Sequence, residues 1–222
     1  KKTKLLHMDI TTRITDTLNS IPKHIDLVAI SKTKSLEEIM EAYNAGQRIF
    51  GENKVQEMNT KREELPSDIQ WHMVGHLQTN KVKYISAFVS LIHSVDSMKL
   101  VKEINKQGVK NNRKISCLLQ VKIAKEITKF GMSSKEVFDV LRASKNFKNV
   151  HIVGLMGMAS LTKDYKQIEK EFKSLKELYD ELKLKFNHFK VLSMGMSSDY
   201  KTAISNGSTM VRIGSQIFGS RN

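Results

Sequence analysis

The stretch LVAIS at residues 27–31 is followed by KTK at 32–34 and by SLEE at 35–38. The first run is short, apolar and β-branched, which is typical of a strand buried in a parallel sheet. Ser35 and Glu38 have the spacing of a capping box, in which each side chain bonds the backbone of the other residue, so a helix is predicted to begin there. Gly46 predicts its end. These residues therefore predict one strand–loop–helix unit.

Seven further short runs resemble the first along the chain. Helical periodicity separates several of them, most clearly after Ser133 and over Lys163–Lys185. Eight strands that alternate with helices predict an α/β fold, a (β/α)8 barrel. An open doubly wound sheet is the competing architecture, because a sequence pattern does not show closure. The predicted strands are Leu27–Ser31, Arg48–Phe50, Gln70–Val74, Ser90–Val95, Ile115–Lys122, His151–Met158, Lys190–Met194 and Met210–Ile213.

The chain of 222 residues contains two prolines and no glycine- or serine-rich linker. We therefore expect a single domain over 1–222, with an extra N-terminal helix at about residues 8–21 and the barrel at about 25–220. The apolar runs are too short for a transmembrane helix, and the basic start lacks the apolar core of a secretory signal. The lone cysteine, Cys117, indicates a reducing, cytoplasmic location, and its apolar strand predicts a buried thiol.

A formal net charge of +14 raises the question of nucleic-acid binding. The excess is mostly lysine, whereas arginine is the better residue for forked recognition of phosphates and bases. Over residues 163–190 the lysines alternate with acidic residues, which is typical of a solvated helix face. A nucleic-acid partner is therefore disfavoured.

In either architecture, chemistry collects at the carboxyl ends of the strands. Lys32 follows the first predicted strand directly, and a lysine at a partly dry barrel mouth can act as a nucleophile toward an aldehyde. The alternative interpretation is that Lys32 is an ordinary surface lysine. Lys34, which lies nearer the start of the helix, could be the reactive lysine instead. The histidines show no metal-ligand spacing: His72 and His76 are four apart, but in a strand and loop that spacing does not share a face.

Small residues follow the last two predicted strands, at Gly195–Ser198 and at Arg212–Ser215. Their backbone N–H groups and hydroxyls can surround an anion, and a phosphate site after strands seven and eight is frequent in this barrel. Ordinary turn chemistry is the alternative explanation.

Taken in order, five segments resemble the pyridoxal phosphate homeostasis proteins, which are built like the barrel domain of alanine racemase. The resemblance implies that Lys32 forms an internal Schiff base, the internal aldimine, with pyridoxal 5′-phosphate (PLP). It implies that Ser197, Gly214 and Ser215 hold the phosphate, that Arg212 approaches the pyridine nitrogen and that Asn53 lines the pocket. Ser35 stands where this family often has proline, and instead supplies the helix cap. The matching segments are 28–34, 50–57, 71–81, 192–199 and 207–219.

The function implied by this resemblance is that of a PLP carrier in vitamin B6 homeostasis, without established turnover. A ring nitrogen that faces arginine stays unprotonated, which makes the cofactor a poorer electron sink. Because the sequence ends after the eighth predicted strand, we expect no counterpart of the second domain of alanine racemase. A minimal single-domain racemase that uses Lys32 as base is the alternative. The expected partners are PLP and PLP-dependent apo-enzymes, and we expect a monomer.

Overall fold

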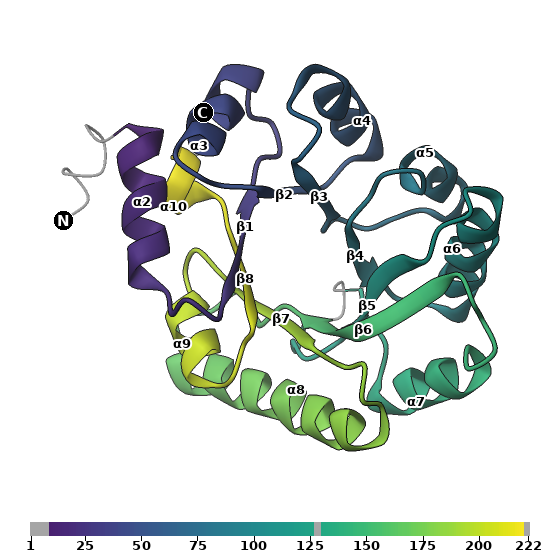
Figure 1. The fold of residues 1–222 in the computed structure, drawn as a ribbon. Coiled ribbons are helices and arrows are strands. Elements are labelled where there is room, and N and C mark those ends of the chain that lie inside the picture. The colour runs from purple at the N-terminus through teal and green to yellow at the C-terminus, as the bar shows by residue number, and fades with distance from the viewer. Residues whose placement is uncertain (1–8, 127–129, 220–222) are drawn as a thin grey trace.

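The computed structural model describes residues 9–126 and 130–219. Eight parallel strands form a closed barrel in the order β1 to β8, with the helices outside (Figure 1). The pairing of Val28 with Arg212 joins β1 to β8, so the barrel prediction is confirmed and the open sheet is excluded. The strands are β1 Asp26–Ile30, β2 Ile49–Glu52, β3 Gln70–Met73, β4 Leu91–Val95, β5 Ile115–Val121, β6 Val150–Gly157, β7 Val191–Met196 and β8 Met210–Ile213.

Helices connect the strands and cover the outside of the barrel. The predicted capping box of Ser35 with Glu38 is present, and a second box, Ser133 with Glu136, begins the helix expected after Ser133. The expected N-terminal helix is α2; Met8, the predicted start, and residue 220, the predicted end of the barrel, lie outside the described residues. The helices are α2 Ile10–Ser20, α3 Leu36–Asn44, α4 Val55–Glu64, the 3-10 turn η1 Thr79–Lys81, α5 Val82–Ile85, α6 Met98–Lys110, α7 Ser134–Ala143, α8 Tyr165–Lys185, α9 Tyr200–Ser205 and α10 Ser215–Phe218.

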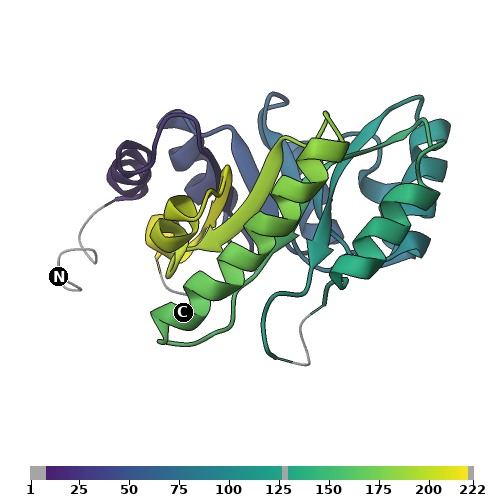
Figure 2. The ribbon, with the colours of Figure 1, turned by 90° about the horizontal axis from the view of Figure 1, so that it is seen from below.

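Two apolar layers hold the barrel together. The larger one lies between strands and helices, and the long helix α8 runs across the outer face of the barrel (Figure 2). A small separate cluster takes one buried residue from each of five strands: Val28, Leu91, Leu118, Met156 and Met210. Cys117 faces the outer layer and is fully buried, and burial raises the pKa of its thiol to about 12. Within residues 9–126 and 130–219, no helix has the length and apolarity needed to span a bilayer.

Candidate functional site

A cavity of about 530 Å³ opens at the carboxyl ends of β1, β7 and β8. Its volume falls within the range of about 300–1,000 Å³ that is usual for small-molecule sites. The charged residues among those lining it are all cations, which favours an anionic ligand. Asn53 follows β2 and is not part of this lining. The lining residues are Ile30, Lys32, Lys34, Leu161, Met196, Ser197, Ser198, Arg212, Gly214, Ser215, Phe218 and Gly219.

Three charged residues, which we call the ion cluster, lie beneath the loop that carries Lys32. They are Glu52 at the end of β2 and Glu57 and Lys61 on α4. Lys61 Nζ lies 2.8 Å from Glu52 Oε1 and 2.6 Å from Glu57 Oε1. The Glu52 side chain is fully buried; burial raises its pKa, and Lys61 opposes that rise. The cluster therefore contains a buried ion pair, Lys61 with Glu52, in which the carboxylate depends on the lysine.

The ion cluster fixes the backbone on both sides of the half-buried Lys32. The Ser31 hydroxyl donates to Glu52 Oε1 at 2.6 Å, and the Ser31 carbonyl accepts from Lys61 Nζ at 2.7 Å. On the other side, the Thr33 N–H donates to Glu57 Oε1 at 2.5 Å. Thr33 has φ +62°, a left-handed conformation that costs a β-branched residue about 1–3 kcal/mol unless its surroundings hold it. The loop is thus held in one shape that aims Lys32 at the barrel mouth.

Lys34 also lines the cavity, but its amine has structural partners. Its Nζ donates to Glu38 Oε1 at 3.0 Å and to the carbonyl of Phe218 at 3.1 Å. These two bonds tie the loop after β1 to α3 and to α10. Lys34 therefore joins three elements at the edge of the cavity.

The loops after β7 and β8 meet across one hydrogen bond, from the Gly214 N–H to the Ser197 hydroxyl at 3.2 Å. Gly195 has φ +96°, and a Cβ on it would lie 2.6 Å from the nearest side-chain atom of α9. That glycine lets β7 turn sharply enough to bring Ser197 beside Gly214. Ser215 follows directly and is exposed at the mouth. The predicted small-residue segments therefore form one wall of amides and hydroxyls.

Arg212 enters the cavity from inside the barrel. It is buried, and its two terminal nitrogens donate to Ser193 Oγ at 2.6 Å and to the Gly157 carbonyl at 3.1 Å. Burial lowers the pKa of Arg212 to about 10, and Asp199 opposes that shift. Arg212 therefore stays cationic at neutral pH. Because a guanidinium carries five N–H donors, it keeps further donors for a ligand.

A buried hydrogen-bonded chain continues from Arg212 across the barrel. Ser193 Oγ lies 3.1 Å from His93 Nδ1, and His93 Nε2 lies 3.0 Å from His72 Nδ1. Burial lowers the pKa of His72 to about 3 and that of His93 well below its ordinary value. Both rings are therefore neutral at pH 7, and each can donate a hydrogen bond from one ring nitrogen and accept one at the other. This chain fixes the position of Arg212.

The sequence pattern predicts the residues of the cavity wall, but it does not predict the ion cluster or the buried hydrogen-bonded chain. The sequence signal for the buried hydrogen-bonded chain is a polar residue inside an otherwise apolar strand, such as His93 in LIHSV at 91–95. For the ion cluster, the signal was the i,i+4 spacing of Glu57 and Lys61. His72 takes part in the interior chain, whereas His76 lies outside it, pairing with Asp96 at 3.3 Å. Within the part of the chain that the structure describes, no group of three or more potential ligands could hold a metal.

Comparison with known proteins places the chain among related sequences. The family model described as "Alanine racemase, N-terminal domain" matches residues 11–222. A protein of Aquifex aeolicus called pyridoxal phosphate homeostasis protein is 41% identical over 197 residues, which is 88% of this chain and 86% of that one. The Schizosaccharomyces pombe protein of the same name is 38% identical over 202 residues, covering 90% of this chain and 85% of that one.

Solved structures show the same similarity in three dimensions. PipY of Synechococcus elongatus, solved with PLP bound, superposes with a TM-score of 0.88 at 34% identity, covering 95% of this chain and all of that one. Alanine racemase of E. faecalis superposes with a TM-score of 0.75 at 15% identity over 96% of this chain and 58% of the enzyme. The enzyme shares the fold of this chain, and at that identity the likeness extends no further.

Proposed function

The chain belongs to the family of the pyridoxal phosphate homeostasis proteins, and on that basis we propose that it binds PLP through Lys32 and serves as a carrier in PLP homeostasis. The observation that carries this proposal is the cavity lining. A half-buried lysine, a wall of amides and hydroxyls and a buried guanidinium lie around one space without a carboxylate in the lining. The lysine can react with an aldehyde, the amides and hydroxyls can bond a phosphate, and the guanidinium can donate to a pyridine nitrogen.

When bound, PLP supplies an aldehyde to the site. Lys32 would hold PLP by condensation of its amine with that aldehyde, which would release one water. The loop supports Lys32 for this role, because Ser31 and Thr33 on either side of it are held by the ion cluster. Lys34 instead links the loop to α3 and α10.

The phosphate is expected to lie against Ser197, Gly214 and Ser215. Hydrogen bonds from amides and hydroxyls to a dianion are charge-assisted and contribute about 1.5–3 kcal/mol each. Pyridoxal, which lacks the phosphate, should therefore bind far more weakly than PLP. Equal affinities would place the phosphate elsewhere. Asn53 lies outside the lining of this cavity, so its contact with the cofactor stays a prediction.

The Arg212 guanidinium supports a carrier role over catalysis. At neutral pH it is cationic and can only donate, so a pyridine nitrogen that it bonds must be unprotonated. Unprotonated, the ring draws electrons weakly from a bound amino acid. We therefore propose that bound PLP is stored and released to apo-enzymes that need it.

The test of the site is borohydride reduction of the PLP-loaded protein, followed by peptide mapping. The pyridoxyl mass should be on Lys32, and Lys32→Ala should abolish it while Lys34→Ala retains it. A mass mainly on Lys34 in the unsubstituted protein would overturn the assignment. For the carrier role, the loaded protein should restore activity to an apo-aminotransferase. Steady conversion of L-alanine to D-alanine would instead establish the racemase alternative.

A further inference from the structure

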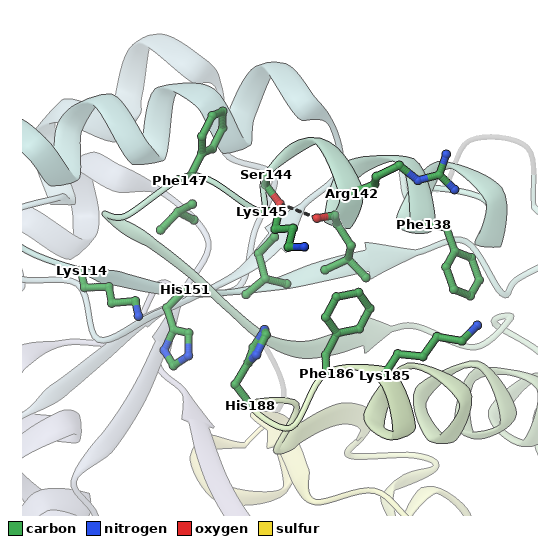
Figure 3. Close-up of a pocket in the computed structure, with 13 residues that line it drawn as sticks. Lys114, Phe138, Arg142, Ser144, Lys145, Phe147, His151, Lys185, Phe186 and His188 are labelled. Carbon is green, nitrogen blue, oxygen red and sulfur yellow. Dashed lines mark hydrogen bonds between the residues drawn. The ribbon is translucent and has the colours of Figure 1, made fainter.

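A second cavity, of about 700 Å³, lies between α7 and α8, and we call it the α7–α8 cavity (Figure 3). Besides residues of these two helices, its lining includes residues at the amino ends of three strands: Lys114 precedes β5, His151 lies near the start of β6 and His188 precedes β7. It therefore lies at the end of the barrel opposite Lys32. That end ordinarily serves stability in this fold, so a large cavity there needs its own explanation.

Aromatic rings line much of the α7–α8 cavity. The ring centroid of His188 lies 5.5 Å from that of His151 and 5.9 Å from that of Phe186. Phe147 and Phe138, both half-buried, contribute further ring surface. Figure 3 shows Phe186 and His188 along one wall, with His151 beyond them. The cavity thus offers flat, partly desolvated surfaces against which another ring can stack.

Four cations line the same cavity, and its lining contains no carboxylate. Lys185 pairs with Glu181 at 2.7 Å, but Lys114, Arg142 and Lys145 form no ion pair within the described residues. In Figure 3 Lys114 extends beside His151, and Lys145 lies across the cavity from Phe186. All four cations are exposed to solvent, so the cavity presents an excess of positive charge that attracts an anion.

We propose that the α7–α8 cavity binds a small aromatic anion, meaning one flat ring that bears a phosphate or a carboxylate. The ring packs on Phe186 and His188, and the anionic group bonds Lys114 and Lys145. A ring without charge leaves the cations uncompensated, and an anion without a ring leaves the aromatic wall in water. The two features together select this ligand class, independently of the proposed function at Lys32.

The two histidines make the binding pH-dependent. Burial, together with the charge of Lys114, lowers the pKa of both rings. A bound anion favours the protonated rings and raises both pKa values, so binding takes up protons and tightens as the pH falls. The charged groups that act on the histidines are Lys114 before β5 and Lys190 before β7. Arg142, Lys145 and Lys185 also line the cavity, and Lys185 pairs with Glu181 on α8.

The test titrates the PLP-loaded protein with phenyl phosphate and benzoate while NMR follows the ring protons of His151 and His188. Loading keeps the probes out of the Lys32 cavity, and the two probes distinguish phosphate from carboxylate recognition. We expect saturable binding by at least one of them. Inorganic phosphate and benzyl alcohol, which each lack one feature, should bind about tenfold more weakly or worse, the loss expected for one missing charged or stacking contact. Equal binding by either control compound would overturn the proposal.

Variants locate the site. Lys114→Gln and Lys145→Gln should each weaken binding about tenfold, the loss expected for one charge-assisted hydrogen bond. Lys135→Gln removes the same charge from the other end of α7 and should leave the affinity unchanged. An equal loss in all three variants would mean that only net charge attracts the probe and would refute the site. Reduction mapping at Lys32 in the same samples reports separately on the proposed function.

Discussion

The Lys61→Met substitution tests whether the ion cluster holds the loop of Lys32. The side chain of Lys61 is 6% exposed and bonds the Ser31 carbonyl, Glu52 and Glu57 at 2.7, 2.8 and 2.6 Å. Methionine retains similar bulk but makes none of these bonds. Glu52 then becomes a buried carboxylate without its cation. We expect the free energy of unfolding to fall by about 3–5 kcal/mol, the usual cost of removing one partner of a buried pair.

This loss should depend on pH in a defined direction. Burial raises the pKa of Glu52, and removing Lys61 removes what opposes that rise. A carboxyl whose pKa is higher in the folded state binds more protons there than in the unfolded state, so acid stabilises the folded form through that window. The deficit of the variant should therefore be smaller at about pH 5 than at about pH 8.

Urea unfolding measures the loss, and Lys176→Met is the matched control. Lys176 forms an i,i+4 pair with Asp180 at 2.5 Å, and the two side chains are 35% and 52% exposed, so that substitution should cost at most about 1 kcal/mol. The Lys61 variant should also couple PLP to Lys32 more slowly, because the Ser31 carbonyl has lost its anchor. Equal small losses in both variants, or a deficit that does not change with pH, would refute a structural role for the ion cluster.

Three further outcomes follow from the buried chain and the surface. Ser193→Ala leaves the Arg212 guanidinium short of an acceptor and should cost about 1–3 kcal/mol in urea unfolding, with a changed visible spectrum of bound PLP. Because the pKa values of His72 and His93 lie below 6.5 in the folded state, the unfolded state binds more protons, and stability should fall by up to about 1.4 kcal/mol per pH unit per histidine as the pH drops below that value. Gel filtration should give the mass of one chain, since the large exposed apolar side chains are scattered over α2, α5, α6, both ends of α8 and two loops.

The strands could be predicted because each is a short apolar run between polar turns. Strand β1 was expected at 27–31 and lies at 26–30, and both capping boxes are formed as the spacing requires. Closure of the barrel could not be predicted in the same way. It depends on the pairing of Val28 with Arg212, whose sequence separation leaves no local pattern.

The candidate site was predictable to the extent that it lies at strand ends. The rule that chemistry collects there pointed to Lys32 and to the loops after β7 and β8, which the fold brings around one cavity. The buried supports were not predictable. Ser193 and His93 are 100 residues apart in sequence, and their bond exists only because opposite strands face each other inside the barrel.

The cavity lining also predicts the stereochemistry of any proton exchange. Racemisation needs a proton to leave one face of the α-carbon and return to the other, which requires an acid–base group on each face. Among the described residues that line the cavity, those groups are Lys32 and Lys34, and both come from the loop after β1. Amino acids incubated with the loaded protein in D2O should therefore gain deuterium, if they exchange at all, with retention of configuration. Mass spectrometry combined with chiral chromatography measures both quantities. Deuterium found equally in the L and D forms would require a base on the opposite face, and the carrier proposal would then give way to the racemase.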